Sequence, residues 1–401
     1  MKKIKSIALV WEQISWGGVD TYLSHLLNSK YFKDISITVY TNENNQGIER
    51  LKKNLNNKLV KIITYNSLLE FYPNNNILKK VYYFLKPIFF IFMILKFKKL
   101  FQGNNYDILM GQCGGYGSIR GEMAAILAAK NIPIKTLIVH HACSHYPPFM
   151  GGFLKLINHV ISKRLSSVIS VSNATRNTLF NKSNLLDREE LHDLVIHNGV
   201  PKFSIEELIK NKKKTPEKFK VCLISRIENY KGHADLISAV NMLPDSYKNK
   251  FEFHFIGTGN LKSIESLKQL TKQLDLEKYF IFSGYLDKKN QEILADFDLA
   301  LSLTRSFEGF GLTIAEAMSA GIPLITTDVG AISEYINSNY CKIIPPSSIE
   351  DLKKALISFV DDNESWKARS DVAKKYINNF HNSDDMAQKY LIHLEQKLNL
   401  K

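Results

Sequence analysis

The sequence has few cysteines, and their positions exclude two classes of protein. The four of them, Cys113, Cys143, Cys222 and Cys341, lie far apart and form no Cys-x-x-Cys or Cys/His ligand spacing. A zinc module and a disulfide scaffold are therefore excluded. The pattern favours reduced, buried thiols and a cytoplasmic protein.

Long uncharged apolar runs are also missing. The longest extends over nine residues from Pro87 to Leu95, whereas a bilayer-spanning helix needs ~20. The N-terminus places a short apolar run, residues 7–10, behind a charged start. That run is too short for a signal peptide and no small-residue cleavage site follows, so we interpret it as a first buried strand.

The composition is that of an ordinary folded protein, with 45% apolar and 23% charged residues. It excludes disorder and fibrous repeats. The formal net charge of +14 is unevenly distributed. Residues 1–200 hold 25 Lys and Arg against 12 Asp and Glu, whereas residues 201–401 hold 28 against 27. A basic N-terminal half indicates an anionic partner, either nucleic acid or an acidic membrane surface.

Short apolar runs alternate with amphipathic segments along the whole chain, which predicts an α/β protein with doubly wound parallel sheets. Helices are expected at 118–130, 260–274 and 312–320. Strands are expected at 6–10, 35–41, 59–65, 107–111, 134–139, 167–171, 219–224, 251–256, 279–283, 298–303 and 323–326. The expected division is an N-terminal domain at 1–200, a linker at 201–218, a C-terminal domain at 219–380, and a helix at 381–401 that packs back toward the N-terminal domain.

The segment 77–101 combines aromatic and aliphatic residues with a fringe of lysines. Those lysines are Lys79, Lys80, Lys86, Lys96, Lys98 and Lys99. One interpretation is a helix lying in an anionic membrane interface. The other is a core helix with a charged edge. The basic character of the whole half favours membrane contact.

The strongest chemical signal lies at 305–334. Glu308 precedes the turn Gly309-Phe310-Gly311, and Glu316 lies about one turn inside the helix that follows. Glycines allow close backbone approach to a ligand, and the first N–H groups of a helix favour a phosphate. Flanking carboxylates could accept hydrogen bonds from sugar hydroxyls, so the segment suits a nucleotide-sugar. The alternative is a pair of glutamates on a solvated helix face.

A second signal follows the strand expected at 219–224. Arg226 and Lys231 lie beyond its carboxyl end, where an anion would bind. Two cations at that position could neutralise a diphosphate leaving group as its bond breaks. The alternative is an ordinary basic surface loop.

In order and spacing, these motifs resemble glycosyltransferase family 4, which comprises retaining, nucleotide-sugar-dependent enzymes of the GT-B fold. The matching segments of the C-terminal half are Arg226…Lys231, Phe255-Ile256-Gly257-Thr258-Gly259, Phe282-Ser283-Gly284-Tyr285 and Glu308…Glu316. Weaker matches lie at 17–22, 172–175 and 197–200. The resemblance is dense over 219–335 and diffuse over 40–130. It implies two Rossmann-like, doubly wound domains that face each other across a cleft.

The resemblance also implies roles for single residues. Arg226 and Lys231 would bind the donor diphosphate, Glu316 the ribose, and Glu308 the hydroxyls of the donor sugar. The remaining donor-site residues lie in glycine-containing turns. They are Gly17, Gly18, Gly257, Tyr285 beside the base, and Gly309, Phe310, Gly311 and Leu312.

His140 and His141 follow the strand expected at 134–139, where the family carries a histidine near the reacting sugar. Gapless comparison favours His140, but the doublet leaves the choice open, and a core histidine is the alternative. Asp20 lies in the first glycine turn. It could serve the acceptor as a base or ligand, or cap the helix that follows.

The sequence thus predicts a retaining glycosyltransferase that moves a hexose or N-acetylhexosamine, from a UDP-sugar by preference, to a polyprenyl-diphosphate-linked glycan. The expected location is the inner face of a bacterial membrane, in the synthesis of capsule, lipopolysaccharide O-antigen or exopolysaccharide. No metal cofactor is expected, because Arg226 and Lys231 can supply the positive charge. The alternatives are a GT-B nucleotide-sugar epimerase, which would bind no lipid, and a nucleic-acid-binding protein, for which no recognition motif is present. An NAD-binding Rossmann protein is disfavoured because no Gly-x-Gly-x-x-Gly follows the first strand.

Overall fold

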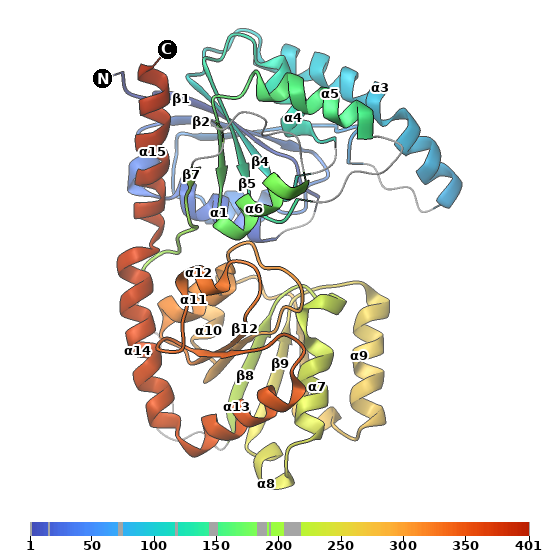
Figure 1. Cartoon of the computed structure of the whole chain (residues 1–401), viewed down its shortest axis with the longest axis vertical. Coiled ribbons are helices and arrows are strands. Elements are labelled where there is room, and N and C mark those ends of the chain that lie inside the picture. Colours follow the sequence, from blue (N-terminus) through green and yellow to red (C-terminus); the bar gives the residue numbers. More distant parts are fainter. Residues whose placement is uncertain are drawn as a thin grey trace. The chain divides into compact units, whose positions relative to one another are not determined.

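The computed structural model describes residues 2–14, 17–70, 75–116, 119–143, 151–182, 191, 194–203 and 218–400. It divides into two compact units (Figure 1). Unit 1 comprises Met1–Gly199 with Ser383–Lys401, and unit 2 comprises Val200–Asn382. Of the linker expected at 201–218, residues 204–217 lie outside the described part.

Unit 1 is built on a parallel sheet with an inner strand that is buried on both faces. In the strand expected at the N-terminus, Ile7 to Trp11 are all fully buried, as a strand covered by helices on both sides requires. The strand order is β3-β2-β1-β4-β5-β6-β7. The strands are β1 Ser6–Trp11, β2 Ser36–Asn42, β3 Val60–Tyr65, β4 Ile108–Cys113, β5 Ile134–Val139, β6 Ser167–Ser170 and β7 Leu194–Val195.

The helices of unit 1 pack in two groups. The helices α3, α4 and α5 share an apolar cluster with Ala8 and Val10 of β1, whereas α1 packs against α15. Between α1 and α15, the ring of Tyr22 meets that of Tyr390 edge-on, with 6.1 Å between centroids. The helices are α1 Gly18–Leu27, α2 Ile48–Asn54, α3 Asn76–Phe101, α4 Gly121–Ala128, α5 Gly151–Ser162, α6 Asn173–Lys182 and α15 Ser383–Asn399.

Unit 2 repeats the architecture with a second parallel sheet, in the order β10-β9-β8-β11-β12-β13. The strands are β8 Phe219–Ile224, β9 Phe251–Ile256, β10 Phe280–Gly284, β11 Leu299–Ser302, β12 Leu324–Thr327 and β13 Lys342–Ile344. Helix α7 contacts α9 and α13, and α11 contacts α10 and α14. The helices are α7 His233–Asn241, α8 Asp245–Lys248, α9 Leu261–Gln273, α10 Asn290–Leu294, α11 Leu312–Ala320, α12 Ile332–Tyr335, α13 Ile349–Asp361 and α14 Asn363–Phe380.

The predicted α/β class with two doubly wound parallel sheets is confirmed. Each strand expected from the sequence is present within one or two residues of its predicted bounds. Two strands were not predicted, β7 and β13. Each is a short edge strand of two or three residues, and so short a run carries no periodic signal.

Helix α3 occupies the segment singled out for its lysines, and its outward face is apolar. Phe84 is 80% exposed, and the exposed apolar positions recur at helical spacing. They are Ile77, Leu78, Val81, Phe84, Ile88, Ile91, Phe92 and Leu95. The prediction placed Lys86 in the charged fringe, which is wrong: Lys86 is buried on the inner face, with Phe90 and Met93. Among the described residues, no helix is long and apolar enough to cross a membrane.

Three buried carboxyl groups in unit 1 keep their protons to unusually high pH. Burial raises the pKa of Glu12 to about 7, with a further contribution from Glu70. Burial also raises the pKa of Asp20 and of Glu122 to about 8. In the unfolded chain such groups ionise near pH 4. The folded protein therefore binds more protons than the unfolded chain from about pH 4 up to about pH 8.

We expect the stability of unit 1 to fall as the pH rises from 6.5 to 8.5, because folding opposes the ionisation of these carboxyl groups. The buried histidine His140, whose pKa is lowered to about 3 by burial, has the opposite dependence, but that effect ends near pH 6.5. Denaturant unfolding at several pH values should show that Glu122→Gln reduces the slope by up to about 1.4 kcal/mol per pH unit. Glu49→Gln, at an exposed position, is the control. An unchanged slope in Glu122→Gln would contradict the assignment.

Candidate active site

The predicted donor-site residues of unit 2 gather at one edge of its sheet. Strands β8 and β11 are parallel neighbours, with Leu299 opposite Val221. They therefore end at the same edge, where the 3-10 turn Asn229–Lys231 and the loop 303–309 follow them. This shared edge brings together residues that lie 77 positions apart in the sequence.

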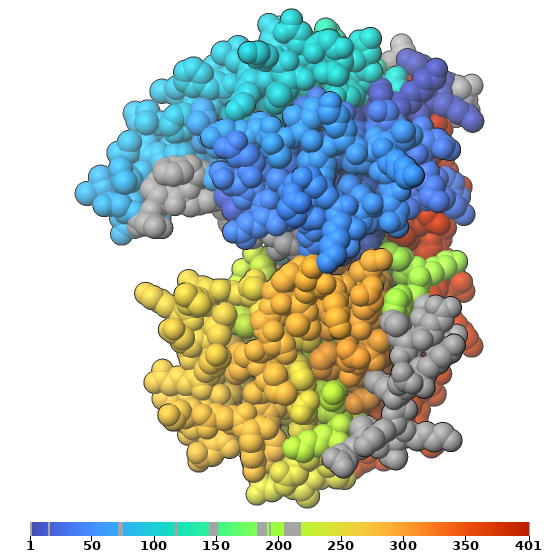
Figure 2. Space-filling view, turned by 180° about the vertical axis from the view of Figure 1, so that it is seen from behind, coloured from blue at the N-terminus to red at the C-terminus, as the bar shows by residue number. Residues whose placement is uncertain are grey.

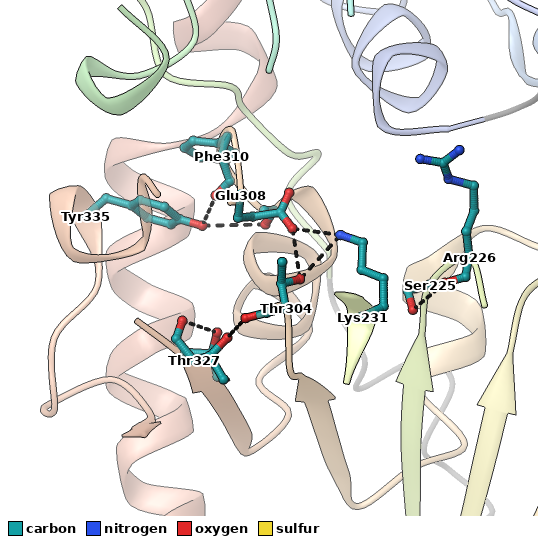
Figure 3. A network of polar contacts seen from close by, with 10 residues as sticks. Ser225, Arg226, Lys231, Thr304, Glu308, Phe310, Thr327 and Tyr335 are labelled. Carbon is teal, nitrogen blue, oxygen red and sulfur yellow. Dashed lines mark hydrogen bonds and ion pairs between the residues drawn. The ribbon is translucent and has the colours of Figure 1, made fainter. Parts of the chain in front are cut away.

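Lys231 and Glu308 form an ion pair at that edge (Figure 3). The Lys231 Nζ donates to Glu308 Oε2 at 3.0 Å, and both side chains are more than four-fifths buried. Thr304 joins the pair, because its Oγ1 lies 3.3 Å from Lys231 Nζ and 3.3 Å from Glu308 Oε2. Thr327 Oγ1 donates to the Thr304 carbonyl at 2.6 Å, which ties the network to β12.

Tyr335 of α12 binds the glycine turn that follows Glu308 through a hydrogen bond and a ring stack. The Tyr335 hydroxyl donates to the Phe310 carbonyl at 2.6 Å, and the two rings stack with 4.5 Å between centroids. Gly311, at φ +85°, is the N-cap of α11, a backbone conformation that glycine adopts without strain. The first N–H groups of α11, from Leu312 onward, thus begin directly beyond the turn.

Gly330 supports the backbone of Glu308 at close range. A Cβ atom on Gly330 would lie 2.2 Å from the Glu308 carbonyl oxygen, and Gly330 has φ +61°. The neighbouring Ala331 N–H donates to the same carbonyl at 3.0 Å. The position of Glu308 is therefore defined by its backbone as well as by its side chain.

Glu316 lies in α11 and is almost fully buried. Its Oε2 accepts a 2.7 Å hydrogen bond from Asn290 Nδ2, which belongs to the first residue of α10. The amide thereby fixes the orientation of the carboxylate. Asn290 carries no motif in the sequence and was not predicted as a site residue.

Arg226 does not join the Lys231–Glu308 network. Its guanidinium pairs instead with Glu228 at 3.0 Å, its side chain is half exposed, and it points away from Lys231 in Figure 3. Both cations lie beyond the carboxyl end of β8, as predicted.

The glycine at the end of β9 brings three strand ends into contact. A Cβ on Gly257, at φ +142°, would lie 2.0 Å from the Ser225 carbonyl oxygen at the end of β8. The Gly257 N–H donates to the Gly284 carbonyl of β10 at 2.8 Å. Tyr285, the next residue, is 45% exposed. Gly257 and Tyr285 therefore lie at the same edge of the sheet as Lys231.

Comparison with known proteins finds one matching family model and several relatives. Residues 204–377 match the family model of the glycosyl transferases group 1. An uncharacterised glycosyltransferase of Methanocaldococcus jannaschii is 25% identical over 250 residues, which cover 61% of this chain and 62% of that protein. A poly(ribitol-phosphate) alpha-N-acetylglucosaminyltransferase of Staphylococcus aureus is 26% identical over 236 residues, covering 56% of this chain and 44% of that protein. The chain thus spans less than two thirds of the length of either relative.

The fold is shared with a solved structure over nearly the whole chain. Anabaena HepE, in complex with UDP and glucose, superposes with a TM-score of 0.72 at 18% identity, covering 98% of this chain and 99% of that one. Residues 204–377 therefore form a glycosyl transferases group 1 domain, and the chain has the GT-B fold. The group 1 domain is consistent with the family 4 membership predicted from the motifs.

An Asp-x-Asp tripeptide of unit 2 lies away from the site. Asp298 of Asp296-Phe297-Asp298 precedes β11, and its carboxylate accepts a hydrogen bond from the Lys220 N–H at the start of β8. These atoms belong to the amino edge of the sheet, opposite Lys231. Within the described part of the chain, no group of three or more His, Cys, Asp or Glu side chains could hold a metal ion.

The remaining predicted site residues belong to unit 1. His140 is buried; its Nε2 lies 2.9 Å from Gln112 Oε1 and its ring meets that of Tyr22 edge-on. Because its pKa is lowered to about 3 by burial, His140 is neutral at physiological pH. His141 is exposed. The structure does not decide between the two, and their proposed role stays a prediction.

The first glycine turn of unit 1 begins α1. Gly17 is its N-cap and Gly18 its first residue, and a Cβ on Gly18 would meet no atom within 4 Å. The Gly17 N–H donates to the Asp20 carboxylate. Asp20 is fully buried. By accepting this hydrogen bond its carboxylate caps the helix, which is the structural alternative that the sequence left open.

Substitution of Gly330 by alanine should impair the protein more than the strain of its left-handed backbone alone would. The left-handed backbone costs about 1–2 kcal/mol for alanine, and the added Cβ would also displace Glu308. We expect a lower melting temperature and a loss of sugar transfer of about 100-fold, the scale of a 1 Å displacement. Gly103→Ala is the matched control, since Gly103 has φ +77° with nothing within 4 Å of its Cβ position. Equal effects in the two variants would contradict the contact with Glu308.

Proposed function

We propose that the protein transfers a hexose or N-acetylhexosamine, with retention, from a UDP-sugar to a lipid-linked glycan in the synthesis of a bacterial surface polysaccharide. The observation that carries this proposal is the Lys231–Glu308 pair beside the N-terminus of α11. It combines a cation for phosphate, a carboxylate for hydroxyls and the positive end of a helix at one edge of the sheet.

The donor would bind along the edge that these groups define. Lys231 and the first N–H groups of α11 would hold the diphosphate, Glu308 the sugar hydroxyls, and Glu316, oriented by Asn290, the ribose. Among the described residues no donor bonds to Glu308 Oε1, so this oxygen is available to a hydroxyl. The pairing of Arg226 with Glu228 is exposed and worth at most about 1 kcal/mol, so a diphosphate could replace Glu228 as its partner.

Transfer would then proceed with charge neutralisation by these cations. As the bond between the anomeric carbon and the phosphate oxygen breaks, Lys231 and Arg226 would stabilise the negative charge that develops on the diphosphate. The acceptor hydroxyl would attack the same face of the sugar, and its proton would pass to a phosphate oxygen. We propose that no metal ion is required, since the two cations supply the charge.

The identity of donor and acceptor is supported by the relatives. The S. aureus relative is named for the transfer of N-acetylglucosamine to poly(ribitol-phosphate), and the similar Anabaena structure contains UDP. The first is consistent with a polymer as acceptor, and the second with a UDP-sugar as donor.

We further propose that unit 1 associates with an anionic membrane surface through α3. Most of the exposed apolar stripe of α3, from Val81 to Leu95, lies between two lysine pairs, Lys79 with Lys80 and Lys98 with Lys99, all of which are exposed. Helix α3 runs along the outer edge of unit 1 (light blue to cyan in Figure 2). An apolar face between basic ends is typical of a helix lying in the interface of an anionic bilayer.

The donor assignment is tested by thermal shift with a panel of nucleotide-sugars. We expect UDP-sugars to raise the melting temperature, and the rise to be unchanged by EDTA if no metal is needed. Lys231→Ala should remove the shift and lower transfer by about 100-fold, the scale seen when one charge-stabilising donor is lost. A near-wild-type Lys231→Ala enzyme would overturn the assignment, and activity that disappears with EDTA and returns with Mn²⁺ would overturn the metal-free proposal.

The membrane proposal is tested by co-sedimentation with vesicles. We expect binding to phosphatidylglycerol vesicles at low salt and little binding to phosphatidylcholine vesicles. Each surface lysine contributes about 1 kcal/mol, so the double change Lys98→Ala and Lys99→Ala should weaken binding about 30-fold. Phe84→Glu should also weaken it, whereas Leu261→Glu, at an exposed apolar position of unit 2, should not. Equal binding to neutral vesicles would refute the electrostatic part of the proposal.

A further inference from the structure

The separation of Lys231 and Glu308 depends on how two loops of unit 2 are joined. Lys231 lies in the turn after β8, and Glu308 lies in the loop after β11. The two loops touch at Gly232, where a Cβ would fall 2.3 Å from the Leu303 carbonyl oxygen. Besides that contact and the bonds that Lys231 itself makes to Thr304 and Glu308, Arg305 bonds the two segments.

Arg305 binds the first segment through its backbone and its side chain. Its N–H donates to the Tyr230 carbonyl at 2.7 Å, next to Lys231. Its guanidinium binds the Asp235 carboxylate in a fork: Nε donates to Oδ2 at 2.7 Å and Nη2 to Oδ1. Asp235 lies in the first turn of α7 and its side chain is 10% exposed.

The fork constrains distance and angle together. A bidentate pair between a planar guanidinium and a carboxylate fixes the orientation of both groups, which a single lysine contact cannot do. Arg305 precedes Glu308 by three residues, and Asp235 follows Lys231 by four. The Arg305–Asp235 pair therefore joins the two segments at positions only three and four residues away from Glu308 and Lys231.

We propose that Arg305 is a positioning residue, whose fork to Asp235 sets the separation of Lys231 and Glu308 for binding the donor diphosphate. This inference rests on the proposed function, since it assigns the pair to the donor. Arg305 itself pairs with Asp235 and is not proposed to contact the donor. Its effect on catalysis would be transmitted through Lys231.

The test measures UDP affinity by calorimetry, and donor KM and kcat, in five variants and one control variant. We expect Arg305→Ala to weaken UDP binding about tenfold and to raise donor KM. Asp235→Asn should act in the same direction, and Arg305→Lys should recover part of the affinity. In a Lys231→Ala background, Arg305→Ala should change UDP affinity less than threefold, because a residue that acts through Lys231 has no further effect once Lys231 is gone.

Lys353→Ala is the matched control, since it removes a 2.9 Å pair with Glu350 on α13 of the same unit and should leave all values unchanged. Melting temperatures check that the variants fold. If Arg305→Ala does not fold, Asp235→Asn provides the same test. The inference is overturned if Lys231→Ala loses UDP while Arg305→Ala and Asp235→Asn bind it normally. Additive losses in the double variant also overturn it. If the wild type binds no UDP, the proposed function fails and this inference fails with it.

Discussion

The parallel pairing of β8 with β11 is the constraint on which the candidate site depends. Two parallel neighbours must end at the same edge of a sheet, so the segments that follow them are brought side by side whatever their separation in the chain. Here that edge receives Lys231 from one segment and Glu308 from the other, 77 residues later. The ion pair, the hydroxyl of Thr304 and the start of α11 all follow from this one register.

Glycines turn that proximity into contact between backbones. At Gly232, Gly257 and Gly330, a Cβ would lie within 2.3 Å of a carbonyl oxygen of a neighbouring loop or strand end. Loops packed backbone against backbone leave little room for movement. The polar groups they carry are then held before any ligand arrives, which is the condition for strong electrostatic stabilisation of a developing charge.

The sequence allowed the fold and the main site residues to be predicted, but not their supporting contacts. Apolar runs such as 219–224 predict buried strands, and the spacing of Glu308, the glycine turn and Glu316 predicts a ligand-binding helix start. Asn290 could not be found in this way, because it reaches Glu316 from the first residue of α10, a five-residue helix that is too short to show a periodic pattern. Pairs such as Asn290–Glu316 depend on tertiary placement, which local patterns do not encode.

The inward position of Lys86 was missed for a related reason: the lysines of 77–101 look alike in sequence, and only packing against Phe90 and Met93 separates this one from the others. The pairing of the cations also differs between the two halves of the chain. The cations near the candidate site are each paired with a carboxylate, as Lys231 is with Glu308 and Arg226 with Glu228. Such pairs add nothing to the net charge.

At the ends of α3, by contrast, the four exposed lysines form no ion pair with any described residue, so their charge extends into the solvent. The chain thus uses positive charge in two ways: locally compensated charge that positions groups in unit 2, and uncompensated charge in unit 1 that can attract an anionic surface at long range.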